Sequence, residues 1–254
     1  MNVDHSERRK KEWLPSMMLI IKRNLPREAA EWSDKDVLDA VAKISHLQLD
    51  GESIDEIDFT QFIDEEILTN LYLQNNKIKQ LNHLDILCNL QLLDLSNNEI
   101  EFVENISKLH QLVFLDLSNN FISHVDIDEF PQSLMILHLS GNPCCDNPDY
   151  RGRIIQDLQN LNELDGQPVG KEEQQECGFV ITRSDDSDEN DDADKSTKVS
   201  NILEKYTCTN KESKDSRIDS LDQLPDKELQ LHGNNETDQE APTSQGFLNS
   251  IDTS

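Results

Sequence analysis

Hydrophobic positions in the middle of the chain recur with a fixed period. Pairs of leucines separated by one residue recur every 22 residues, and their first members are Leu71, Leu93, Leu115 and Leu137. A less regular pair, Leu47 and Leu49, stands 24 residues before the first of these. Both leucines of a pair point to one face of a short strand, because successive side chains in a strand alternate. One such unit cannot bury its leucines alone, so the period predicts an array in which neighbouring units stabilise each other.

A polar position follows each regular leucine pair. Three residues after the second leucine stand asparagines, namely Asn76, Asn98, Asn120 and Asn142. The pattern L-x-x-L-x-L-x-x-N-x-L resembles that of leucine-rich repeats. This resemblance implies an α/β fold, a solenoid of about five repeats with a parallel sheet on its concave face. Buried amides must be satisfied, and the backbone of the adjoining turns is nearest, so we assign the asparagines to a structural ladder.

The two ends of the array need polar caps. Residues 33–36 resemble a capping box and predict the start of a helix with apolar residues at helical spacing. Downstream, apolar residues at helical spacing over 150–164 predict a second helix that Gly166 ends. These boundaries divide the chain into three parts. We expect an N-terminal extension at 1–32, a repeat domain with helical caps at 33–170, and a disordered acidic tail at 171–254.

The tail differs from the repeats in composition. Residues 185–194 contain seven acidic residues, and 171–254 contain only three aromatic residues. Such a segment buries too little apolar surface to fold, so we expect it to be disordered. The whole chain carries 51 Asp and Glu against 23 Lys and Arg, a net charge of -28. This acidity argues against a nucleic-acid partner and against docking on anionic membranes.

The sequence also predicts an intracellular, cytoplasmic location. No run of apolar residues approaches the roughly 18 that a membrane-spanning helix needs, and the charged N-terminus lacks the features of a signal peptide. The five cysteines are an odd number at unrelated spacings, which disfavours a disulfide framework.

No cofactor, metal site or catalytic residue is predicted. Asp94, Asp116 and His138 on neighbouring strands could mimic an acid–base group, but an open sheet face excludes little water. The chain has no glycine-rich phosphate loop, and its histidines and cysteines lack zinc-site spacing. We therefore expect a protein that is not an enzyme.

The concave face is the candidate binding site. Leu92, Phe114 and Ile136 form an apolar row one position before the leucines, beside the polar column of Tyr72, Asp94, Asp116 and His138. Exposed apolar residues with polar neighbours are typical of partner-binding surfaces. The alternative is that the tail, a cap or the loops shield them. We expect a protein partner of unknown identity and a chain that is monomeric on its own.

Segments that flank the repeats suggest a narrower resemblance. The period and the terminal Tyr150-Arg151 and Leu164-Asp165-Gly166 resemble intracellular leucine-rich repeats of the phosphatase-regulatory type. Residues 22–25, 128–134 and 164–169, among others, resemble a ciliary and sperm-flagellar member of that group, and the likeness covers about residues 17–170. The resemblance implies a scaffold or adaptor in a cilium or flagellar axoneme. Two alternatives stay open, a regulatory subunit of a protein phosphatase and an acidic nuclear protein that shields histones.

Overall fold

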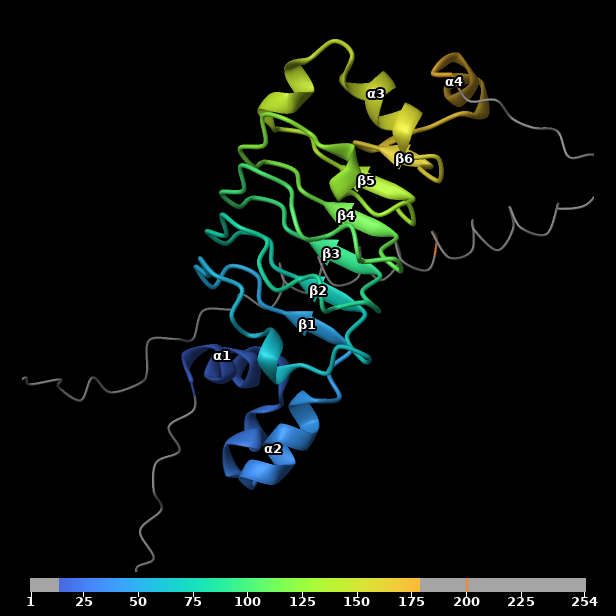
Figure 1. Cartoon of the computed structure of the whole chain (residues 1–254). Coiled ribbons are helices and arrows are strands. Elements are labelled where there is room, and N and C mark those ends of the chain that lie inside the picture. The colour runs from blue at the N-terminus through green and yellow to red at the C-terminus, as the bar shows by residue number, and fades with distance from the viewer. Residues whose placement is uncertain (1–13, 179–199, 201–254) are drawn as a thin grey trace, which may run out of the picture. The chain divides into compact units, whose positions relative to one another are not determined.

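A single sheet of seven strands runs through the whole repeat domain (Figure 1). The structure is a computed structural model that describes residues 14–178 and 200. The strands follow one another in chain order. Strands β1 to β5 are parallel and three residues long, and β6 continues the parallel order before β7 pairs antiparallel with β6. Their bounds are β1 His46–Gln48, β2 Asn70–Tyr72, β3 Leu92–Asp94, β4 Phe114–Asp116, β5 Ile136–His138, β6 Glu163–Leu164 and β7 Gln167–Pro168.

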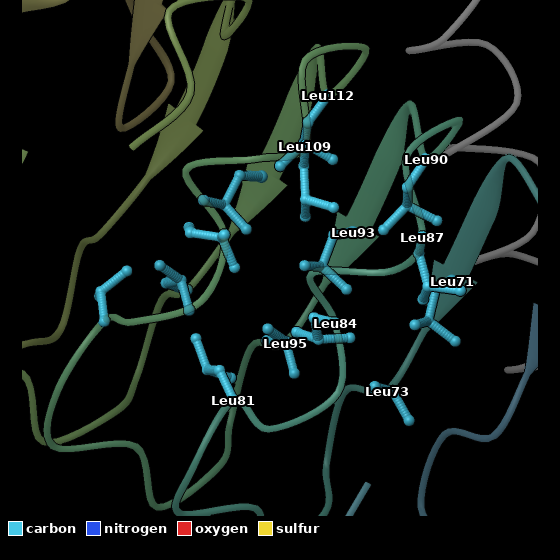
Figure 2. Close-up of a cluster of buried hydrophobic side chains, with 14 of the residues drawn as sticks. Leu71, Leu73, Leu81, Leu84, Leu87, Leu90, Leu93, Leu95, Leu109 and Leu112 are labelled. Atoms are coloured by element: carbon cyan, nitrogen blue, oxygen red, sulfur yellow. The ribbon is translucent and has the colours of Figure 1, made fainter. Parts of the chain in front are cut away.

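The register of the sheet follows the 22-residue period. Leu71 pairs with Leu93, Leu93 with Leu115, and Leu115 with Leu137. These leucines are fully buried, and Figure 2 shows their neighbours from the connecting segments pointing into the same interior. Each turn of the chain therefore packs its leucines on those of the next turn. The predicted leucine-rich repeat solenoid, with five parallel strands joined by four turns, is confirmed.

The N-terminal cap begins earlier than the expected boundary at residue 33. Helix α1 (Pro15–Asn24) places Met17 and Ile20 in the main core, where both are 0% exposed. The side chain of Asn24 accepts a hydrogen bond from the Gln48 backbone N–H (2.7 Å) and donates one to its carbonyl (3.1 Å). Because this amide pairs with the edge of β1 as a neighbouring strand would, α1 is part of the folded domain and not an extension.

A second helix follows at the predicted capping box. Between α1 and this helix lies the short 3-10 segment η1 (Arg27–Glu31). Helix α2 (Asp34–Val41) starts after Ser33, whose hydroxyl accepts a hydrogen bond from the Asp36 backbone N–H at 3.2 Å. Single-turn 3-10 segments occur in three later connections, at η2 Thr60–Phe62, η3 Ile127–Glu129 and η4 Pro143–Asp146.

The helix of the C-terminal cap is shorter than predicted. Helix α3 (Tyr150–Asp157) ends well before Leu164, which lies in β6. Asp165 and Gly166 both have positive φ, 54° and 73°, as the tight turn between β6 and β7 requires. The expectation of one helix over 150–164 was therefore wrong, because the apolar spacing that suggested it continues into a strand.

Side-chain bonds close this cap beyond the expected boundary at residue 170. Arg151 donates two hydrogen bonds to the carboxylate of Glu173 (2.6 and 2.9 Å), in helix α4 (Lys171–Glu176). The hydroxyl of Tyr150 donates to Asp165, whose other oxygen accepts the backbone N–H groups of Leu139 and Ser140. Asp165 thus accepts the backbone N–H groups at the end of the last repeat, which have no further repeat to bond.

The expected disordered tail lies almost wholly outside the described residues. Within the described residues, no helix has the length and apolar character needed to cross a membrane.

Candidate functional site

The side chains of the ladder asparagines form hydrogen bonds with the backbone of neighbouring turns. The amide of Asn98 donates to the carbonyls of Leu73 (2.9 Å) and Leu95 (3.0 Å) and accepts from the backbone N–H of Ile78 (3.0 Å). The same three kinds of bond recur at Asn120 one turn later. The remaining members, Asn76 and Asn142, also donate to two turns at once. These side chains therefore connect the backbones of neighbouring turns.

The concave face carries an apolar cluster of its own. The backbone register sets Leu92, Phe114 and Ile136 side by side on β3, β4 and β5, and Tyr72 on β2 joins them. The partly buried Val113 packs against this concave cluster, which is separate from the main core. The strand alternation that buries Leu93 and Leu115 inside the solenoid sends these residues to the opposite face.

The concave cluster is buried, which differs from the exposed row that the sequence suggested. Leu92, Phe114 and Ile136 are 0% exposed and Tyr72 is 1% exposed. The alternative of a shielded row fits these values. The alternation of side chains predicts which face a residue occupies, but it does not predict what lies over that face.

Two carboxylates flank the concave cluster on neighbouring strands. Asp94 and Asp116 are paired in register and are 1% and 5% exposed. Each uses one carboxylate oxygen to accept both the backbone N–H and the hydroxyl of the serine two residues later, Ser96 at 3.0 and 2.7 Å and Ser118 at 2.8 and 2.6 Å. The carboxylates therefore fix the ends of their own strands as well as charging the concave face.

His138 joins the carboxylates to the concave cluster. Its Nδ1 lies 3.6 Å from Asp116 Oδ2, and its Nε2 lies 3.2 Å from Glu163 Oε1. Burial by itself lowers the pKa of a histidine, but these two carboxylates outweigh burial and raise the pKa of His138 to about 9. Burial likewise opposes ionisation of Asp116, yet His138 and Ser118 hold the pKa of that carboxyl below its usual value. His138 is therefore a cation at neutral pH.

Sequence reasoning missed Glu163. It belongs to β6, which pairs with β5 and so brings the carboxylate to His138. The residue stood inside the segment predicted as helix, and no periodic signal marked it. A turn signal at Asp165-Gly166 was the feature that could have indicated a strand on either side.

The concave face combines apolar, anionic and cationic side chains. Large apolar side chains, buried carboxylates and one imidazolium offer contacts for apolar and cationic groups. Within residues 14–178 and 200, no cluster of three or more His, Cys, Asp or Glu side chains could hold a metal ion.

Comparisons with known proteins agree with this fold. The family described as Leucine Rich repeats (2 copies) matches residues 88–132. With the repeat register of the sheet, this match defines the class: the chain is a leucine-rich repeat protein.

Within this class the chain resembles a particular curated protein. It is similar to leucine-rich repeat-containing protein 46 of Mus musculus, with 44% identity over 151 residues, which is 59% of this chain and 46% of that protein. The protein of the same name from Macaca fascicularis is 60% identical over 42 residues, 16% of this chain and 13% of that protein. The aligned region thus spans less than half the length of these relatives.

Two solved structures are also similar to part of this chain. One is the Drosophila melanogaster SNF/U2A′ complex, with 21% identity and a TM-score of 0.49 over 57% of this chain and 89% of the matched chain. Another is a leucine-rich repeat protein of Leptospira interrogans, with 28% identity and a TM-score of 0.39 over 52% of this chain and 33% of that chain. The family match and the curated relatives support a protein-interaction role for this chain.

Proposed function

We propose that the chain is a non-catalytic scaffold or adaptor that binds a protein partner through its concave face, in a cilium or sperm flagellum. The binding residues are those of the concave cluster and its polar neighbours, Tyr72, Leu92, Asp94, Phe114, Asp116, Ile136 and His138. The observation that carries the proposal is the second apolar cluster on the side of the sheet away from the core.

The solenoid itself does not require that cluster. Leucines on the core-facing side of the sheet already fill the interior of the solenoid. The opposite, concave side of such a sheet is commonly polar when it faces water. Four large apolar side chains there, all buried, serve contact with a further element rather than the packing of the repeats.

The size of the face limits the interaction. Five strands at about 4.8 Å spacing span roughly 20 Å, which is narrow for the ~800 Å² per partner of a standard interface. The flanking loops therefore extend the contact. The ciliary location and an axonemal partner rest on the similarity to leucine-rich repeat-containing protein 46.

Co-purification from multiciliated or spermatogenic cells tests this function. The tagged full chain is extracted under conditions that keep axonemes intact, beside Phe114→Ala on the concave face and Phe102→Ala on a loop, where the side chain is 65% exposed. We expect the chain to recover axonemal proteins, Phe114→Ala to lose them and Phe102→Ala to retain them.

Recovery of other partners would favour one of the alternative functions. Recovery of a phosphatase catalytic subunit would favour a regulatory subunit instead. Salt-sensitive histone recovery that deletion of 171–254 abolishes would favour a nuclear histone-shielding protein. Equal recovery by Phe102→Ala and Phe114→Ala would place the binding site away from the concave face.

A further inference from the structure

The concave cluster has a degree of burial that the sheet alone does not explain. Phe114 is 0% exposed and Tyr72 is 1% exposed, although both project from the face opposite the solenoid core. A bulky ring on the concave face of a single sheet stays in contact with water unless another element lies over it. The burial of both rings therefore calls for a cover.

The described helices lie elsewhere. In Figure 1, α1 and α2 gather at the β1 end of the array, and α3 and α4 gather at the β6 end. Strands β2 to β5 carry the cluster, and in the described part of the chain they pack chiefly on neighbouring strands. The cover thus belongs to chain outside the described residues or to another molecule.

One segment of the remaining chain has the required pattern of apolar residues. Val199, Ile202, Leu203 and Tyr206 stand at i, i+3, i+4 and i+7, the spacing that lines one face of a helix. Ser200, the single described residue in this stretch, is helical and exposed. The sequence of residues 195–208 therefore predicts an amphipathic helix with one apolar face.

The charge of the same segment complements the face. Residues 195–208 contain three lysines, Lys195, Lys198 and Lys205, and one acidic residue, Glu204, so 3 − 1 gives a net charge of +2. Buried carboxylates such as Asp94 and Asp116 favour a cationic neighbour over an acidic one. The acidic run at 185–194 lacks this complementarity, because it would add charge of the same sign.

The lengths are also compatible. The apolar positions from Val199 to Tyr206 span about 10 Å of helix at 1.5 Å per residue, close to the roughly 14 Å across three strand spacings from Tyr72 to Ile136. Twenty-one residues lie between Gly178 and Ser200, and such a connection reaches up to about 70 Å. The chain can therefore return to its own concave face.

We propose that residues 195–208 cover the concave cluster as a tethered internal ligand. The consequence of this inference rests on the proposed function: if a partner binds the concave face, the segment and the partner compete for the same site. A tether gives the segment a high effective concentration. The partner must then supply a helix of the same kind, apolar on one side and basic, or bind more tightly than the segment does.

Hydroxyl-radical footprinting of the full chain tests the cover directly, because it reports the solvent access of individual side chains. The variant Ile202→Glu/Leu203→Glu disrupts the apolar face of the segment. The matched control Ile218→Glu/Leu221→Glu changes another apolar pair in the same C-terminal region. We expect oxidation of Tyr72 and Phe114 to rise several-fold in the first variant only.

Internal references keep the result interpretable. Phe121 is 59% exposed and should be oxidised equally in all three proteins, whereas the core residue Phe59 is 2% exposed and should stay protected. Unchanged protection of Phe114 in Ile202→Glu/Leu203→Glu would overturn the proposal, as would equal opening by the control variant. Protection that disappears on dilution would show a second copy as the occupant and would also overturn it.

The same variants separate this inference from the proposed function. If Ile202→Glu/Leu203→Glu exposes Phe114 and increases the recovery of partner proteins, both proposals are supported. If it exposes Phe114 but recovery stays the same, the internal cover is supported and the concave face is not the partner site.

Discussion

The ring of His138 lies edge-on against the ring of Phe114, with centroids 5.5 Å apart and an interplanar angle of 74°. The same imidazole contacts the carboxylates of Asp116 and Glu163. One side chain therefore connects the apolar and the charged parts of the concave face. It also links the last full repeat to the C-terminal hairpin, because Glu163 lies in β6.

This arrangement predicts a pH dependence of stability at alkaline pH. The pKa of His138 is raised from 6.5 to about 9 in the folded protein, so folding favours the protonated form. The resulting stabilisation is fully present below pH 6.5 and is lost as the pH rises through 9. Urea unfolding of the full chain between pH 6 and 10 should show this loss.

Two histidine variants isolate the effect. His138→Gln should flatten the dependence of the unfolding free energy on pH between 6.5 and 9. His110→Gln, at an exposed position, should keep it. An equal slope in wild type and His138→Gln would show that the contacts with Asp116 and Glu163 do not hold the proton.

The asparagine ladder predicts a large effect of a single amide. Asn98→Leu removes bonds to Leu73, Leu95 and Ile78, and leaves their buried backbone groups without that partner. We expect the free energy of unfolding to fall by roughly 2–4 kcal/mol. Asn82→Leu is the control, because that exposed amide bonds only the side chain of Gln80 among the described contacts. Equal unfolding midpoints for wild type and Asn98→Leu would contradict a structural role.

Periodic features of this chain could be predicted from sequence, because each repeat places the same side chain in the same surroundings. The register of Leu71 with Leu93 follows directly from the 22-residue spacing. Features that occur once could not be predicted in this way. Helix α1 adds Met17 and Ile20 to the core, but a single short helix carries no repeat to identify it.

The candidate site shows the same division. Repetition identified the concave positions of Asp94, Asp116 and Phe114, since each has a counterpart one turn away. The second carboxylate partner of His138 could not be predicted, because Glu163 reaches it through a hairpin outside the repeats. The burial of Phe114 depends on an element over the face, which periodicity does not report.

A turn between repeats provides a further prediction about backbone strain. Gly141 has φ +77°, and a Cβ there would lie 2.3 Å from Asn119 Oδ1. Gly141→Ala should therefore lower the free energy of unfolding by about 1–3 kcal/mol. Gly170→Ala is a matched control, because nothing lies within 4 Å of its added Cβ and its φ is −82°. Thermal unfolding of the two variants should separate them, and equal melting temperatures would contradict the strain argument.

Photo-crosslinking from the concave face shows directly whether a partner binds there. A benzophenone amino acid replaces Tyr72 on β2 of the full chain in ciliated cells, and Phe102 in a parallel sample. Mass spectrometry then identifies what each position captures. We expect the probe at Tyr72 to capture a partner protein or residues 195–208, and the probe at Phe102 to capture neither. Capture of the partner from Phe102 alone would contradict a concave binding face.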